Sequence, residues 1–114
     1  MSKHYKEVLN HILDECAFIQ QTITPQITKS DFIENETLKR AIVRSLEIIG
    51  EATKKIPVDI KLKWKEVQWK NMAGMRDKLI HDYFGVNYSI VWDVIKNKIP
   101  ELSQQIKRVL DSLE

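Results

Sequence analysis

Apolar residues recur along this chain at intervals of three and four positions, the spacing of one face of an α-helix. The first such series runs from Tyr5 and predicts a helix that ends near Thr24, because Pro25 pushes the residue before it out of the helical region. The members of the series are Tyr5, Val8, Leu9, Ile12, Cys16, Ile19 and Ile23.

A second series predicts a helix that starts near Ser30 or Asn35, both competent N-caps, and runs to Pro57. Its inward positions are Leu38, Ile42, Ser45, Ile49, Ala52 and Ile56. Gly50 inside this helix costs about 1 kcal/mol relative to alanine, which favours close packing against a neighbouring helix. Residues 57–63 are polar and are expected to form a short connection.

The remaining apolar positions predict a third helix from Trp64 to a stop at Gly85, and a fourth that Asn87 caps. The pair Ile99-Pro100 interrupts the fourth, and a last helix follows that either stands alone or is only kinked from it. The inward positions of the third helix are Trp64, Val67, Met72, Met75 and Leu79. The pattern therefore predicts an all-α protein, an antiparallel bundle of four to five helices in one domain over residues 1–114.

Composition narrows the class of protein further. With one cysteine, Cys16, the chain forms no intramolecular disulfide and no cysteine-based zinc site, and Cys16 is expected in the core. No stretch of 18 uninterrupted apolar residues is present, so we expect a soluble cytoplasmic protein with no membrane partner.

Charge is distributed unevenly. Between Lys54 and Lys78 the sequence has eight basic and three acidic residues, a net charge of +5. Because the whole chain has a net charge of +2, the rest of it carries −3. A stretch of this kind is typical of a solvated face and also attracts nucleic acid.

The stretch ends in the motif Arg76-x-x-x-x-His81-x-Tyr83. Arginine is a permanently charged, forked phosphate ligand, histidine transfers protons near neutral pH, and tyrosine offers a hydroxyl for modification. The structural alternative is that the arginine and histidine interact with carbonyls at a helix end while the tyrosine packs.

RNA cleavage without a metal needs a base, an acid and a cation beside the phosphate. On an ideal helix Tyr83 lies about 20° from Arg76 but His81 about 140° from it. The three therefore converge if the last turn loosens before Gly85, if the long Arg76 side chain bends across, or if a second subunit supplies part of the site, and we favour the last option together with some loosening. One His81 per chain leaves one proton-transfer role empty, and a symmetric dimer would fill it. His4 and His11 lack a carboxylate that would complete a metal site, and neither a phosphate-binding loop nor a Ser/His/Asp arrangement is present, so no metal or cofactor is expected.

Further motifs accompany this one: Trp69 and Met75 before it, Ile48-Ile49-Gly50-Glu51-Ala52 upstream and Val91-Trp92-Asp93 downstream. Together and in this order they resemble the HepT-type branch of the HEPN superfamily, over nearly the whole chain, roughly Lys3 to Leu113.

The resemblance implies a dimeric helical toxin of a type VII-like toxin–antitoxin system, an endoribonuclease that cuts mRNA or tRNA. It implies that Arg76 and His81 are the catalytic pair and that an MntA-type nucleotidyltransferase antitoxin transfers AMP to Tyr83. We add Glu51, Lys78 and Asp82 as candidate supporting residues. The alternative is a non-catalytic HEPN module that docks onto a nucleotidyltransferase; a helix-turn-helix DNA binder is disfavoured because the basic stretch lacks a short turn followed by a recognition helix.

Overall fold

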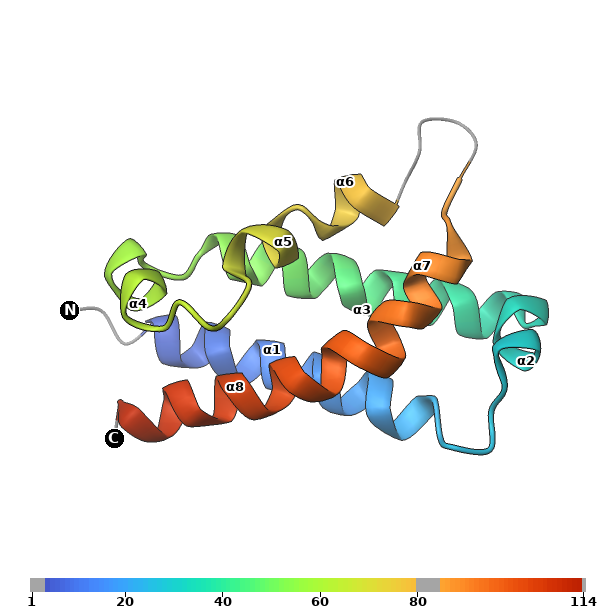
Figure 1. Ribbon diagram of the computed structural model, residues 1–114, viewed down its shortest axis with the longest axis horizontal. Helices are drawn as coiled ribbons and strands as arrows, with labels where there is room; N and C mark the ends of the chain where they lie inside the picture. Colours follow the sequence, from blue (N-terminus) through green and yellow to red (C-terminus); the bar gives the residue numbers. More distant parts are fainter. Residues whose placement is uncertain (1–3, 80–84, 114) are drawn as a thin grey trace.

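The computed structural model describes residues 4–79 and 85–113, with the backbone alone for His4 and Arg76. Every element in these ranges is a helix, which confirms the all-α prediction (Figure 1). The long helices α1 (His4–Thr22), α3 (Glu36–Lys54) and α8 (Ile99–Ser112) form the bundle, since α1 packs along both α3 and α8. No helix in the described part of the chain is long and apolar enough to cross a membrane.

Helix α1 follows its predicted series closely. Leu9, Ile12, Cys16 and Ile19 are fully buried, so the face predicted from spacing is the one that packs. Burial raises the pKa of the Cys16 thiol to about 12, which keeps it protonated at neutral pH. The prediction that Cys16 is a core residue is confirmed.

The predicted second helix consists of two helices joined at Asn35. Helix α2 (Lys29–Glu34) begins at Thr28, whose hydroxyl accepts from the Asp31 N–H in a capping box, and it ends at Asn35. The Asn35 side chain then caps α3 by accepting from the Leu38 N–H at 2.9 Å. Both predicted starting regions therefore begin helices, and the one-residue joint at Asn35 is the difference from the prediction.

Gly50 of α3 lies against α5 (Trp69–Ala73). A Cβ built on Gly50 would be 3.0 Å from the Met72 carbonyl oxygen, closer than most real Cβ contacts. This confirms the close helix packing that Gly50 predicted.

The prediction of a polar connection over residues 57–63 is wrong, because this segment contains α4 (Val58–Lys63). Pro57 is its N-cap and Ile60 is buried, while Val58 and Leu62 are exposed. A helix of six residues with one buried side chain shows no apolar period, and the sequence pattern therefore missed it.

The prediction of one continuous third helix from Trp64 to Gly85 is also wrong. Trp64 ends α4, and the helical residues that follow are divided at Gly74 into α5 and α6 (Met75–Leu79). The turn between α4 and α5 is fixed by the Trp69 indole N–H, which donates to the Trp64 carbonyl at 2.9 Å. Val67 of this turn is buried, so the apolar spacing continues through residues that are not helical.

The C-terminal helices form one kinked rod. Helix α7 (Tyr88–Asp93), which Asn87 caps as predicted, passes through a π-helical turn, η2 (Val94–Lys98), into α8 with Pro100 in its first turn. The interruption at Ile99-Pro100 is therefore a kink. Phe32 of α2 anchors the start of the rod, with ring centroids 6.3 Å from Tyr88 and 5.6 Å from Trp92.

Candidate active site

The motif begins on α6, which carries the backbone of Arg76. Met75 and Leu79, four residues apart, are 7% and 1% exposed and fix the helix to the core. Asp77 and Lys78 of the same helix are exposed. His81, Asp82 and Tyr83 lie outside the described residues.

The described residues on either side of this segment meet. The Asn87 N–H donates to the Leu79 carbonyl at 3.0 Å, so α6 ends where α7 begins. Gly85 just before this junction has φ 88°, a conformation that side chains disfavour. Leu79 and Asn87, eight positions apart in the sequence, are therefore in direct contact.

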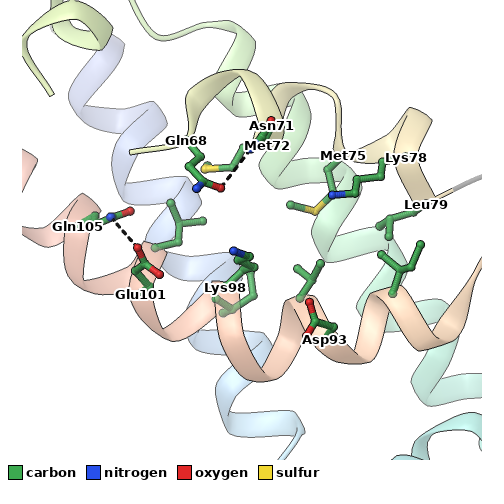
Figure 2. A pocket seen from close by; sticks show the side chains of 14 residues that line it. Gln68, Asn71, Met72, Met75, Lys78, Leu79, Asp93, Lys98, Glu101 and Gln105 are labelled. Atoms are coloured by element: carbon green, nitrogen blue, oxygen red, sulfur yellow. Dashed lines mark hydrogen bonds between the residues drawn. The ribbon is translucent and has the colours of Figure 1, made fainter. Parts of the chain in front are cut away.

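A pocket of about 260 Å³ opens beside α6, between α5–α6 on one side and α7, η2 and α8 on the other. Figure 2 shows Gln68, Met75 and Lys78 on the first side and Asp93, Lys98 and Glu101 on the second. Buried methionine, leucine, isoleucine and valine side chains line its interior, while carboxamide and charged groups stand around it.

The candidate supporting residues do not all come together. Lys78 lines the pocket beside α6, whereas Glu51 lines a second hollow of about 310 Å³ between α1 and α3, with His11 and Arg44. The Glu51 carboxylate is 3.3 Å from Lys54, and its side chain is 62% exposed. Lys78 and Glu51 therefore belong to different surfaces of the protein.

The described side chains offer no ready metal site. Within residues 5–75, 77–79 and 85–113, no three His, Cys, Asp or Glu side chains are grouped so that they could hold a metal ion. His11 is 3.7 Å from Glu15, an i,i+4 pair on an exposed face of α1.

Sequence reasoning missed the polar residues around the pocket beside α6. Gln68, Asn71, Lys98 and Gln105 come from segments more than 25 positions apart, and only the path of the C-terminal rod brings them together. The Gln105 amide connects α8 to the segment before α5, because it donates a hydrogen bond to the Glu66 carbonyl at 3.2 Å. The spacing of Gln68 and Asn71 on one helical face was visible, but nothing in the sequence indicated what faces them.

A helical bundle that carries Arg76 on a short helix agrees with the predicted resemblance to HEPN-type proteins. Residues 12–109 match the family model described as "Ribonuclease HepT-like". The chain belongs to the HepT-like ribonuclease family. This membership confirms the predicted resemblance and the predicted class of enzyme, a ribonuclease.

Similar proteins agree with this assignment. A protein of Caldanaerobacter subterraneus subsp. tengcongensis, named "Putative RNase", is 53% identical over 102 residues, 90% of each chain. A Methanocaldococcus jannaschii protein, also named "Putative RNase", is 47% identical over 91 residues, which are 80% of this chain and 78% of that protein. The "Probable ribonuclease HepT" of Thermococcus cleftensis is 39% identical over 109 residues, 96% of this chain and 98% of its own. No solved structure matches the chain significantly.

Proposed function

We propose that the protein is the toxin of a type VII-like toxin–antitoxin pair, a metal-independent endoribonuclease that a nucleotidyltransferase silences by adenylylation. Membership of the HepT-like ribonuclease family supports the activity. The observation that carries the proposal is the place of the motif: it starts on α6, beside an open pocket with Lys78 and Lys98 at its edge. An RNA strand approaching Arg76 would meet cationic and hydrogen-bonding groups there.

In the proposed reaction the 2′-hydroxyl of the substrate loses its proton to His81 and attacks the adjacent phosphorus. The new bond from phosphorus to the 2′-oxygen forms as the bond to the 5′-oxygen breaks, and a second acid group protonates the departing oxygen. Arg76 neutralises the charge that develops on the phosphoryl oxygens. The products are a 2′,3′-cyclic phosphate and a 5′-hydroxyl end.

The second acid group is the His81 of another copy. The proposed active form is therefore a homodimer in which two copies of the motif share one cleft. Because the junction of α6 and α7 lies at an edge of the bundle, a second subunit can reach it without displacing the core.

Silencing acts on Tyr83. Its hydroxyl oxygen would attack the α-phosphorus of ATP held by an MntA-type antitoxin, with release of pyrophosphate. The attached AMP carries a phosphodiester charge close to the catalytic pair in sequence, where it would bind Arg76 and exclude the substrate phosphate.

Three variants, each with a control of the same residue type, test this function. His81→Ala is compared with His11→Ala, whose side chain is exposed on α1, and Tyr83→Phe with Tyr88→Phe. Arg76→Ala is compared with Arg40→Ala, whose side chain is 81% exposed. Loss of one proton-transfer group should cost about 100-fold or more in cleavage rate.

We expect His81→Ala and Arg76→Ala to relieve growth inhibition and stop RNA cleavage, with unchanged helix content. We expect the antitoxin with ATP and Mg²⁺ to modify and silence Tyr88→Phe but not Tyr83→Phe. Wild-type cleavage by His81→Ala would refute the catalytic role of His81, and absence of cleavage by the wild type itself would support the docking module.

A further inference from the structure

The pocket beside α6 has the size and walls of a site for one flat ring system. Its volume of about 260 Å³ is just below the range of about 300–1,000 Å³ that is typical of small-molecule sites. Met72 and Met75 form one wall and Ile99 and Leu102 the other, all of them buried. A heteroaromatic ring would pack between thioether and aliphatic groups, while a sugar and phosphate would stay outside.

Carboxamides at the edge keep unused hydrogen-bonding atoms. Asn71 donates to the Gln68 side-chain oxygen at 3.2 Å, and Gln105 donates to the Glu101 carboxylate at 3.2 Å. The Gln68 amide nitrogen and the Asn71 and Gln105 oxygens have no such partner among the described residues. Gln68 therefore offers donors, and Asn71 and Gln105 offer acceptors, to the edge of a nucleobase, which carries both kinds of group.

The charges around the pocket favour a neutral ring over an anion inside it. Two lysines, Lys78 and Lys98, are balanced by two carboxylates, Asp93 and Glu101. Asp93 accepts from Asn97 at 2.6 Å and Glu101 accepts from Gln105, so both carboxylates are already hydrogen-bonded. Neither lysine forms an ion pair with another described residue, which leaves both ammonium groups available to phosphates at the edge.

We infer that this pocket binds one unstacked base of the single-stranded RNA substrate next to the cut, and so gives the nuclease a base preference at that position. The inference rests on the proposed ribonuclease function. Lys78, at the edge of the pocket, is two residues after Arg76 on the same short helix, so the two positions are about 3 Å apart along the axis of α6 and about 200° apart around it. A strand held at Arg76 therefore reaches the opening of the pocket by passing around α6. Sequence-specific RNA proteins recognise single strands in this way, by holding a splayed base and bonding its edge.

The test compares cleavage of one RNA oligonucleotide with versions in which a single nucleotide near the cut is abasic. In the wild type, removal of one base should slow cleavage on the order of tenfold, with smaller effects at the other positions. Asn71→Trp adds an indole at the opening and should reduce this position dependence to less than about twofold. Asn10→Trp, the same change on the exposed face of α1, should retain it.

The outcomes separate this inference from the proposed function. Cleavage that does not depend on the abasic position, or position dependence that survives in Asn71→Trp, would overturn the base pocket and leave the ribonuclease intact. So would a loss of dimers in Asn71→Trp by sedimentation, which would make the pocket a contact between copies. Competition by free AMP without any abasic effect would assign it to a mononucleotide. If no RNA strand is cleaved at all, the proposed function itself fails.

Asn71→Trp is chosen because Asn71 is exposed, and matching thermal unfolding to the wild type verifies its fold. Gln68→Ala provides a second variant that removes one amide and adds no bulk. It should lower the preference for the favoured base over its competitors severalfold while leaving the abasic oligonucleotide at the wild-type rate. An equal loss on both oligonucleotides would contradict a base contact.

Discussion

Gly50→Ala should destabilise the protein, although alanine is the better helix former. A Cβ at this position would lie 3.0 Å from the Met72 carbonyl oxygen and 3.7 Å from that of Ala73. The second distance is an ordinary contact, whereas the first is too short, and the Met72 oxygen is a backbone atom of α5 that cannot rotate away as the end of a side chain would. The new methyl group therefore forces α3 and α5 apart.

Two opposing effects set the magnitude. Replacing glycine by alanine in a helix interior gains about 1 kcal/mol. Forcing an extra methyl group into a packed contact costs about 1–3 kcal/mol. Since the contact is with rigid backbone, we expect the upper part of that range and a net loss of about 1 kcal/mol. For a domain of this size that corresponds to roughly 4 °C in Tm.

Urea unfolding, followed by circular dichroism, measures this loss of stability. All variants are compared at one protein concentration, because dimer formation would add to the apparent stability. Gly74→Ala is the matched control, since its Cβ would be 3.5 Å from the Lys70 carbonyl, an ordinary contact, and its φ is −88°. This control should be unchanged or stabilised by about 0.4–1 kcal/mol. A Gly50→Ala midpoint at or above that of the wild type would refute the reasoning.

Three further predictions concern the helix ends and the core. Asn35→Ala removes the cap of α3 and should cost about 1 kcal/mol in urea unfolding, and an unchanged midpoint would show that the cap contributes nothing. Phe32→Ala empties a fully buried site against Tyr88 and Trp92 and should cost about 3–5 kcal/mol, so a loss below 1 kcal/mol would contradict the anchor. Because the folded pKa of Cys16 is about 12, against 9.0 ordinarily, stability should fall as pH rises from about 9 toward 12, and less so in Cys16→Ala. If stability fell equally with rising pH in the wild type and in Cys16→Ala, the raised pKa of Cys16 would be contradicted.

The long helices were predictable from sequence because each buries one complete face. The intervals of three and four residues in α1 correspond to side chains that are fully buried, and the cap at Asn35 and the cap at Asn87 are local hydrogen bonds that depend on few neighbours. Periodicity and capping both depend on residues that are close together in the sequence. They are therefore accessible without knowledge of the fold.

Helix α4 and the turn that precedes α5 could not be predicted, because neither buries one complete helical face. Helix α4 has one buried residue, Ile60, and therefore no period to detect. Trp64 and Val67 continue the apolar spacing toward α5, yet they pack from a turn that a hydrogen bond between Trp69 and Trp64 stabilises. Burial sets the spacing here, and the backbone conformation is decided by tertiary contacts.

In the candidate site too, the local motif could be predicted from the sequence, whereas the pocket formed by distant segments could not. The spacing of Arg76, His81 and Tyr83 led to the family, which the comparison with known proteins confirms, while the roles of the three residues stay predictions. The pocket beside α6 could not be predicted, because Lys98 and Gln105 reach it only through the kinked path of the C-terminal rod.

The motif depends on packing more than on its own helix. Helices α5 and α6 have five residues each, far below the length at which a helix is stable alone in water. Contacts with α3 and the Asn87–Leu79 hydrogen bond must therefore hold them, so that a change at Gly50 acts on the site through α5. Gly50→Ala should for this reason lower RNA cleavage by a larger factor than the lost stability alone predicts, whereas Asn35→Ala, a comparable loss far from α5, should not. Equal activity of the two variants, at a temperature where both are folded, would show that the site is positioned independently of the packing at Gly50.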